Sequence, residues 1–165
     1  MIALSYDIIA SEPLLRVSEI VVTAILGLSV LGSTIIFNRS QSKIEKHRLQ
    51  KDLFGEFNKR YDVLNDYLEK VTKYDSLEHL LKKKPKKYLF LRNKLNDYFN
   101  LCAEEYYWYN KGRIDKDLWK SWEVGMNSWY NNHSIIREAW EEEYNNFGYQ
   151  SFYLKKEEQF FKKEK

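Results

Sequence analysis

Few residues in this 165-residue chain have the types and spacing that catalysis requires. The three histidines, His47, His79 and His133, are isolated and fit no spacing typical of a metal site. Only six glycines occur, and no glycine-rich phosphate-binding loop is among them. The acidic run 141–143 is more typical of a solvated helix face than of paired catalytic carboxylates. We therefore expect no catalytic residue, no metal, no cofactor and no enzymatic activity.

The pair Arg92 and Asn93 has the arginine-polar pattern that some all-helical ribonucleases use in an R-x4–6-H motif. No arginine of this chain has a histidine at that spacing, and Asp97 and Phe99 stand where Arg92 would need one. Two interpretations stay open: a degenerate nuclease position, or an arginine that pairs with the acids of a neighbouring helix. Cys102, the lone cysteine, is expected to be a small buried apolar residue in a reducing compartment.

The lysine run 82–87, KKKPKK, is predicted to be a loop, because the residue before a proline avoids the helical region. Lysines neutralise phosphates without regard to sequence, so anionic lipid or RNA is a conceivable partner. No aromatic residue is interleaved among these lysines to stack on a base. A solvated loop is the favoured interpretation, and direct nucleic-acid binding stays open.

The element that decides the class of the protein is the run 20–37, eighteen residues without an ionisable side chain. As a helix it spans roughly 27 Å, enough for the hydrocarbon core of a bilayer. It contrasts with a chain whose mean hydropathy is −0.64. No cleavage site follows it, so we expect a transmembrane helix rather than a signal peptide. Pro13 predicts that the helix begins near that residue.

Basic residues gather after this run, whereas only Arg16 precedes it. The positive-inside rule therefore predicts an extracytoplasmic segment 1–19, a membrane helix 20–37 and a cytoplasmic domain 38–165. The residues next to the membrane are suited to anionic lipid; they are Arg39, Lys43, Lys46 and Arg48, followed by Lys51.

A helical projection of the run places small and hydroxyl residues on one side and mostly branched aliphatic residues on the other. Three interpretations of this stripe stay open: helix packing in an oligomer, the lining of a pore, and accident. The first two both require several copies of the chain. The stripe consists of Arg16, Thr23, Gly27, Val30, Thr34 and Asn38.

The rest of the chain predicts an all-α bundle of four to five helices. The first continues from the apolar run without a break and ends near Asp75 or Leu81. The second covers 88–112, with Gly112 at its end. In each of these two helices, apolar and aromatic residues recur at spacings of three and four and mark the face expected in the core. They are Leu53, Phe57, Tyr61, Leu64, Leu68 and Val71 in the first, and Tyr88, Leu91, Leu95, Tyr98, Cys102, Tyr106 and Tyr109 in the second. Asp115 and Ser134 are expected to cap a third and a fourth helix, and Gly148 to end the last. The third helix is predicted to carry Leu118, Trp122, Gly125 and Trp129 on one side, and a short charged tail to follow the fourth.

Residues 91–122 resemble a pattern of small bacterial membrane-anchored proteins: LNxYxxL at 95–101, then a GxID turn at 112–115. With its anchor and size, the whole chain resembles the small membrane accessory proteins of type VI-B CRISPR systems, which are helical and HEPN-like. The resemblance implies a ring-shaped homo-oligomer in the bacterial inner membrane. Such a pore would depolarise the cell and enhance antiviral defence by an RNA-guided RNase acting upstream. The alternatives are a membrane-tethered adaptor for a cytoplasmic partner and a membrane-bound ribonuclease.

Overall fold

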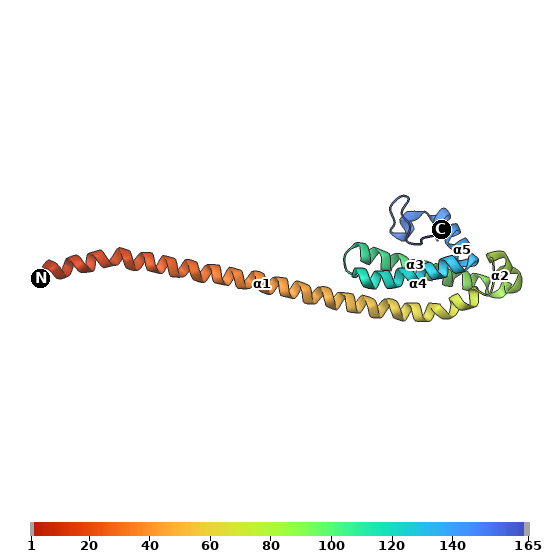
Figure 1. Ribbon diagram of the computed structural model, residues 1–165, viewed down its shortest axis with the longest axis horizontal. Helices are drawn as coiled ribbons and strands as arrows, with labels where there is room; N and C mark the ends of the chain where they lie inside the picture. The colour runs from red at the N-terminus through yellow and green to blue at the C-terminus, as the bar shows by residue number, and fades with distance from the viewer. Residues whose placement is uncertain (1, 164–165) are drawn as a thin grey trace. The chain divides into compact units, whose positions relative to one another are not determined.

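The computed structural model describes the backbone of residues 2–163 and the side chains of residues 16–163. Within this range the protein is all-helical and contains no strand, as predicted (Figure 1). The chain divides into two compact units between His47 and Arg48. The elements are α1 (Ile2–Val71), α2 (Leu77–Lys83), a 3-10 turn η1 (Pro85–Lys87), α3 (Tyr88–Asn110), α4 (Lys116–Asn132), α5 (Ser134–Phe147) and a 3-10 turn η2 (Tyr149–Phe152).

The first helix, α1, is uninterrupted, which confirms that the apolar run continues as helix into the following residues. Its predicted start is wrong, because the helix begins at Ile2 and Pro13 lies inside it. A proline within a helix removes one backbone hydrogen bond, and the apolar residues on both sides of it continue the helical pattern. The side chains of residues 1–15, which belong to the expected segment 1–19, lie outside the described part.

The end of α1 also differs from the prediction. The helix stops at Val71, and Ser76 starts α2 by accepting a hydrogen bond from the His79 amide at 3.1 Å. A serine cap satisfies an amide that the start of a helix would otherwise leave unpaired. The predicted loop 82–87 is in fact almost wholly structured. Its first two lysines end α2, and Pro85 opens the 3-10 turn that leads into α3.

The boundaries of α3 and α4 follow the predicted signals. Gly112 adopts φ +65°, a backbone conformation that favours glycine, two residues after α3 ends. Asp115 caps α4, since its Oδ1 accepts the Leu118 amide hydrogen at 2.8 Å. Gly148 likewise closes α5, and its amide donates to the Tyr144 carbonyl. Ser134 is not the cap of α5: it is the first helical residue, and its hydroxyl donates to the Asp75 carbonyl.

The core of the second unit lies between residues 48–71 of α1 and helices α3, α4 and α5. Its buried side chains on α1 and α3 follow the predicted periodicity, from Phe57 to Val71 and from Leu91 to Cys102. Three of the four residues expected on one side of α4, Leu118, Trp122 and Trp129, are half-buried and pack against this core. The buried residues are Trp119, Met126 and Tyr130, whereas Gly125 is exposed. Aromatic rings occur on both faces of α4, so periodicity alone favoured neither face.

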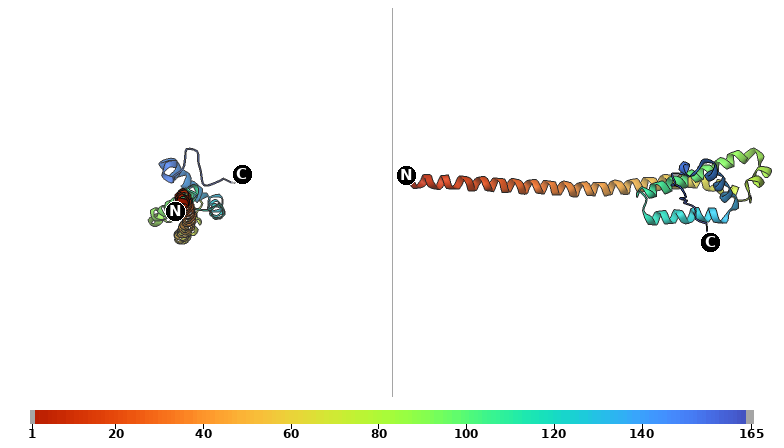
Figure 2. Two further views of the ribbon diagram at one scale, coloured as in Figure 1. Left: turned by 90° about the vertical axis from the view of Figure 1, so that its left-hand side faces the viewer. Right: turned by 90° about the horizontal axis from the view of Figure 1, so that it is seen from above.

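The C-terminal residues are part of the core and not a free charged tail. Phe160 and Phe161 are buried, with ring centroids 4.7 Å and 5.1 Å from that of Trp140. The Tyr106 hydroxyl, on α3, donates to the Glu158 carboxylate at 2.6 Å. After α5 the chain therefore turns back through η2 and packs against α3 and α5 (Figures 1 and 2).

Candidate functional site

The apolar segment of α1 is the one helix among the described residues that is long and apolar enough to cross a membrane. Its most apolar window has a mean hydropathy of 2.4, and none of that window is buried inside the chain. Apart from Gly32, which is half-buried, every side chain from Ile20 to Phe37 is exposed. Apolar side chains exposed all around a helix require an apolar surrounding, such as lipid or other copies of the same helix.

The stripe predicted on this segment follows one side of the helix, and all six residues are exposed. The Thr34 hydroxyl donates to the Val30 carbonyl at 2.8 Å, so its hydrogen is satisfied within the helix. A Cβ atom added at Gly27 would meet no atom within 4 Å, which leaves its surface open to a neighbouring helix. The members are Arg16, Thr23, Gly27, Val30, Thr34 and Asn38.

The basic residues that follow the apolar segment are exposed on α1 but do not share one face. Arg39, Lys43 and Lys46 recur at i, i+4 and i+7, which places them on one side of the helix. Arg48 lies on the opposite side and reaches Asp52 at 4.0 Å, with both side chains largely exposed. An exposed pair of this kind contributes little to stability. Three of the four predicted residues therefore form a common basic face.

Arg92 is a bridge between two helices of the bundle. Its guanidinium donates to Glu143 at 2.8 Å, to Glu142 at 3.1 Å and to the Ala139 carbonyl at 3.3 Å. The Arg92 and Glu143 side chains are only 12% and 10% exposed. This is the arrangement expected of an arginine that pairs with the acids of a neighbouring helix. Asn93, the other residue of the nuclease-like pair, is exposed on α3.

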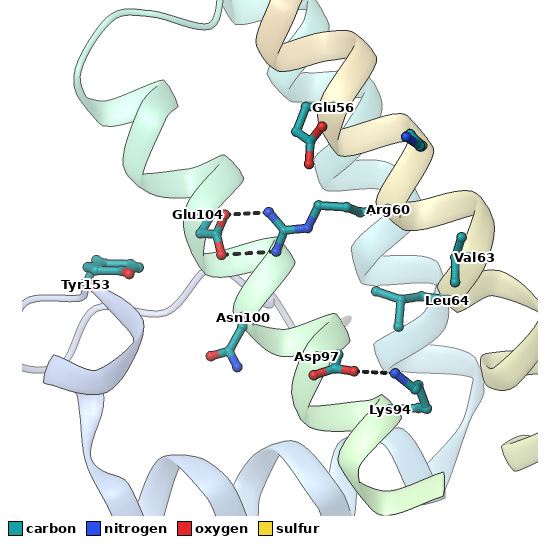
Figure 3. Close-up of a pocket in the computed structure, with 10 residues that line it drawn as sticks. Glu56, Arg60, Val63, Leu64, Lys94, Asp97, Asn100, Glu104 and Tyr153 are labelled. Atoms are coloured by element: carbon teal, nitrogen blue, oxygen red, sulfur yellow. Dashed lines mark hydrogen bonds and ion pairs between the residues drawn. The ribbon is translucent and has the colours of Figure 1, made fainter. Parts of the chain in front are cut away.

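A second ion-pair network fills a surface groove of about 510 Å³ between α1 and α3 (Figure 3). The Arg60 guanidinium makes two hydrogen bonds to the Glu104 carboxylate, at 2.6 Å and 3.0 Å, and this pairing raises the pKa of Arg60. Lys94 pairs with Asp97 at 2.7 Å. Three basic and three acidic side chains line the groove, so its charges balance one another, and the Arg60–Glu104 pair links α1 to α3.

The neighbouring carboxyl, Glu105, is buried. Burial raises its pKa to about 8, and the charge of Arg60 only partly opposes this shift. Glu105 lines a small cavity of about 190 Å³ together with Tyr98 and Cys102. Cys102 is buried as predicted, and burial raises the pKa of its thiol well above the usual value. A protonated buried thiol is a poor nucleophile.

Sequence reasoning missed Arg60, Glu104 and Glu105. The signal for Glu105 was present, because it follows Tyr98 by seven residues and Cys102 by three, on the stripe predicted to be buried. Charged residues are commonly excluded from such a stripe, which is why it was overlooked. Arg60 gave no signal, since its partner is 44 residues away in the sequence.

Neither a set of metal-ligating side chains nor a similar protein indicates an activity for these residues. Among the described residues, no group of three His, Cys, Asp or Glu side chains is placed to hold a metal ion. Comparison of the chain with protein-family models, with curated proteins and with solved structures gives no match.

Proposed function

We propose that this protein is a non-enzymatic membrane effector whose copies associate through the apolar segment of α1 and together form a path for ions. The observation that carries this proposal is the exposed apolar segment with its one-sided stripe of small and hydroxyl residues. A helix that only anchored a monomer would gain nothing from such asymmetry. The resemblance to the accessory proteins of type VI-B CRISPR systems supports the same function, in antiviral defence alongside an RNA-guided RNase.

The chemistry of the stripe is suited to contact between helices. In a bilayer, helices associate through close packing at small residues, because lipid already satisfies their apolar surfaces. Gly27 leaves room for such an approach, and Thr34 brings a hydroxyl that needs no further acceptor. Several copies that turn the same stripe inward enclose a path lined mainly by small, hydroxyl and carboxamide groups, with Val30 as the branched aliphatic residue among them.

The charge distribution supports one orientation. By the positive-inside rule, the basic residues that follow the apolar segment favour a cytoplasmic bundle and an N-terminus outside. In the bacterial inner membrane, an open path of this kind dissipates about 2.3 kcal/mol per elementary charge for each 100 mV of potential. Opening the assembly would therefore depolarise the cell without any catalytic step.

Two measurements test the proposal. The mass of the detergent-solubilised particle should correspond to several copies, and a monomer overturns the proposal. Cells expressing Thr34→Leu should keep the assembly but lose depolarisation, measured with a potential-sensitive dye. Ser29→Leu is the matched control, because it also replaces a hydroxyl, on a part of the helix about 120° from Thr23. Equal dye responses in the two variants contradict a path lined by the stripe.

Exchange of the anchor separates this function from its main rival, a membrane-tethered adaptor. Residues 16–38 are replaced by an unrelated membrane helix of the same length, and the bundle is left unchanged. If the protein forms a pore through its apolar segment, cells that express this exchanged protein should no longer depolarise. If activity in the cell is retained, the bundle rather than the apolar segment carries it, and the protein is a tethered adaptor.

A further inference from the structure

Five lysines from the segment between the end of α1 and the start of α3 line one surface basin of about 610 Å³, here called the lysine basin. They come from the last turn of α1, the connections before and after α2, and the turn η1. Residues that are up to 17 positions apart in the sequence are thereby brought together. They are Lys70, Lys73, Lys84, Lys86 and Lys87.

The lysine basin has no acidic side chain among the residues that line it. Among the described residues, Lys73, Lys84, Lys86 and Lys87 take part in no ion pair within 4.0 Å, whereas Lys82, outside the basin, pairs with Glu78. Helix α3 begins at this basin, and its first turn carries no acidic residue. The positive end of the helix dipole therefore adds to the charge of the lysines. This contrasts with the balanced groove at Arg60.

Aromatic rings adjoin these lysines, although none is interleaved among them in the sequence. Tyr67 from α1 and Phe90 from α3 meet edge to face, with ring centroids 5.4 Å apart. The Lys70 ammonium lies 5.0 Å from the Tyr67 ring centroid. Phe90 is 50% exposed, so part of its ring is available to a ligand. The fold thus supplies the stacking surface that the run 82–87 lacks.

We propose that the lysine basin binds single-stranded nucleic acid, with phosphates on the lysines and a base stacked on Phe90. Ammonium groups beside aromatic rings are the combination by which proteins hold single strands with little sequence preference. A duplex presents no free base face to a ring, so it uses only half of this chemistry. An anionic lipid headgroup likewise needs the lysines but gives no reason for a ring to matter. The inference concerns the bundle and does not depend on pore formation.

The test uses the full chain in nanodiscs of zwitterionic lipid and a fluorescent ten-residue oligouridine, with binding followed by anisotropy. The logarithm of the affinity should fall with the logarithm of salt concentration with a slope of about −2 to −3, as for three or four neutralised phosphates. Lys84→Gln with Lys86→Gln should weaken binding and reduce this slope by about 1.4, or about 0.7 per lost contact. The matched control is Lys155→Gln with Lys156→Gln, which removes the same charge elsewhere and should change neither value.

Phe90 separates nucleic acid from other anions. Phe90→Ala should weaken oligouridine binding about tenfold without changing the salt slope, because stacking releases no counterions. Leu89→Ala, a neighbouring exposed apolar residue, should leave binding unchanged. Circular dichroism confirms that each variant is folded. The proposal is overturned if the chain does not bind oligouridine, or if it binds phosphatidylserine vesicles in place of oligouridine. It is also overturned if the two lysine double variants bind oligouridine with equal affinity.

Discussion

Glu105 makes the stability of the bundle depend on pH in a direction opposite to that of most carboxylates. Burial raises its pKa from 4.5 to about 8 in the folded chain. In the unfolded chain the carboxyl regains its ordinary pKa and loses its proton above about pH 4.5. Between these two values the folded chain therefore holds one more proton than the unfolded chain. The free energy of unfolding should fall across this window by about 1.4 kcal/mol per pH unit.

The size of the effect follows from the two pKa values. At pH 7 the carboxyl is ionised in the unfolded chain and protonated in the folded chain. This pH lies about 2.5 units above the pKa of the unfolded carboxyl, so the wild type has lost about 3 kcal/mol of its free energy of unfolding. Glu105→Gln removes the titration and keeps the shape of the side chain. Relative to the wild type, the variant should gain about 3 kcal/mol between pH 4.5 and pH 7, and nothing further above about pH 8.

Urea denaturation of the detergent-solubilised full chain, followed by tryptophan fluorescence at several pH values, measures this difference. Subtracting the two proteins cancels every other titrating group, and any constant cost of the amide leaves the slope unchanged. Glu141→Gln is the matched control, because Glu141 is exposed on α5. Parallel stability curves for wild type and Glu105→Gln between pH 5 and pH 8 would refute the reasoning.

Three further predictions, the first with a comparison variant, concern the bundle and use the same denaturation assay. Arg92→Ala should lower the free energy of unfolding by about 3 kcal/mol, because it leaves the Glu143 carboxylate buried without its partner. Arg48→Ala, which removes one member of an exposed ion pair, should lower it by less than about 1 kcal/mol. Equal losses in the two variants would contradict the bridging role of Arg92. Asp115→Ala should cost about 1 kcal/mol through the lost cap of α4, and no change would show that the cap is dispensable. Phe161→Ala should cost about 3 kcal/mol if the C-terminal residues belong to the core, and an unchanged midpoint would place them outside it.

Local signals in the sequence predicted the helices well. Gly112, Asp115 and Gly148 act at helix ends through their own backbone or side chain, and each does so where the sequence indicated. Periodicity also identified the buried faces of α1 and α3, because one face of each carries most of the apolar residues. These features depend on neighbours within a few residues in the sequence, and a local sequence pattern carries information over that range.

The wrong predictions concern residues whose position depends on partners distant in the sequence. Ser134 has the type of a cap, yet its hydroxyl bonds the Asp75 carbonyl 59 residues away. The residues after Gly148 are highly charged, and only the fold shows that Phe160 and Phe161 enter the core beside Trp140. The lysine basin belongs to the same class, because Tyr67 and Phe90 meet only after α1 and α3 pack together.

The stripe on α1 shows why one sequence pattern favours both packing and a pore. The Thr34 hydroxyl hydrogen is bonded to the Val30 carbonyl of its own helix, so the group can face lipid or a neighbouring helix without an unsatisfied donor. The same oxygen keeps a lone pair that accepts a hydrogen bond from water. Both roles therefore need the same residues, and the number of copies decides between them. Two helices with their stripes against each other would exclude water, whereas a larger ring, as proposed above, would hold the stripes apart and admit it.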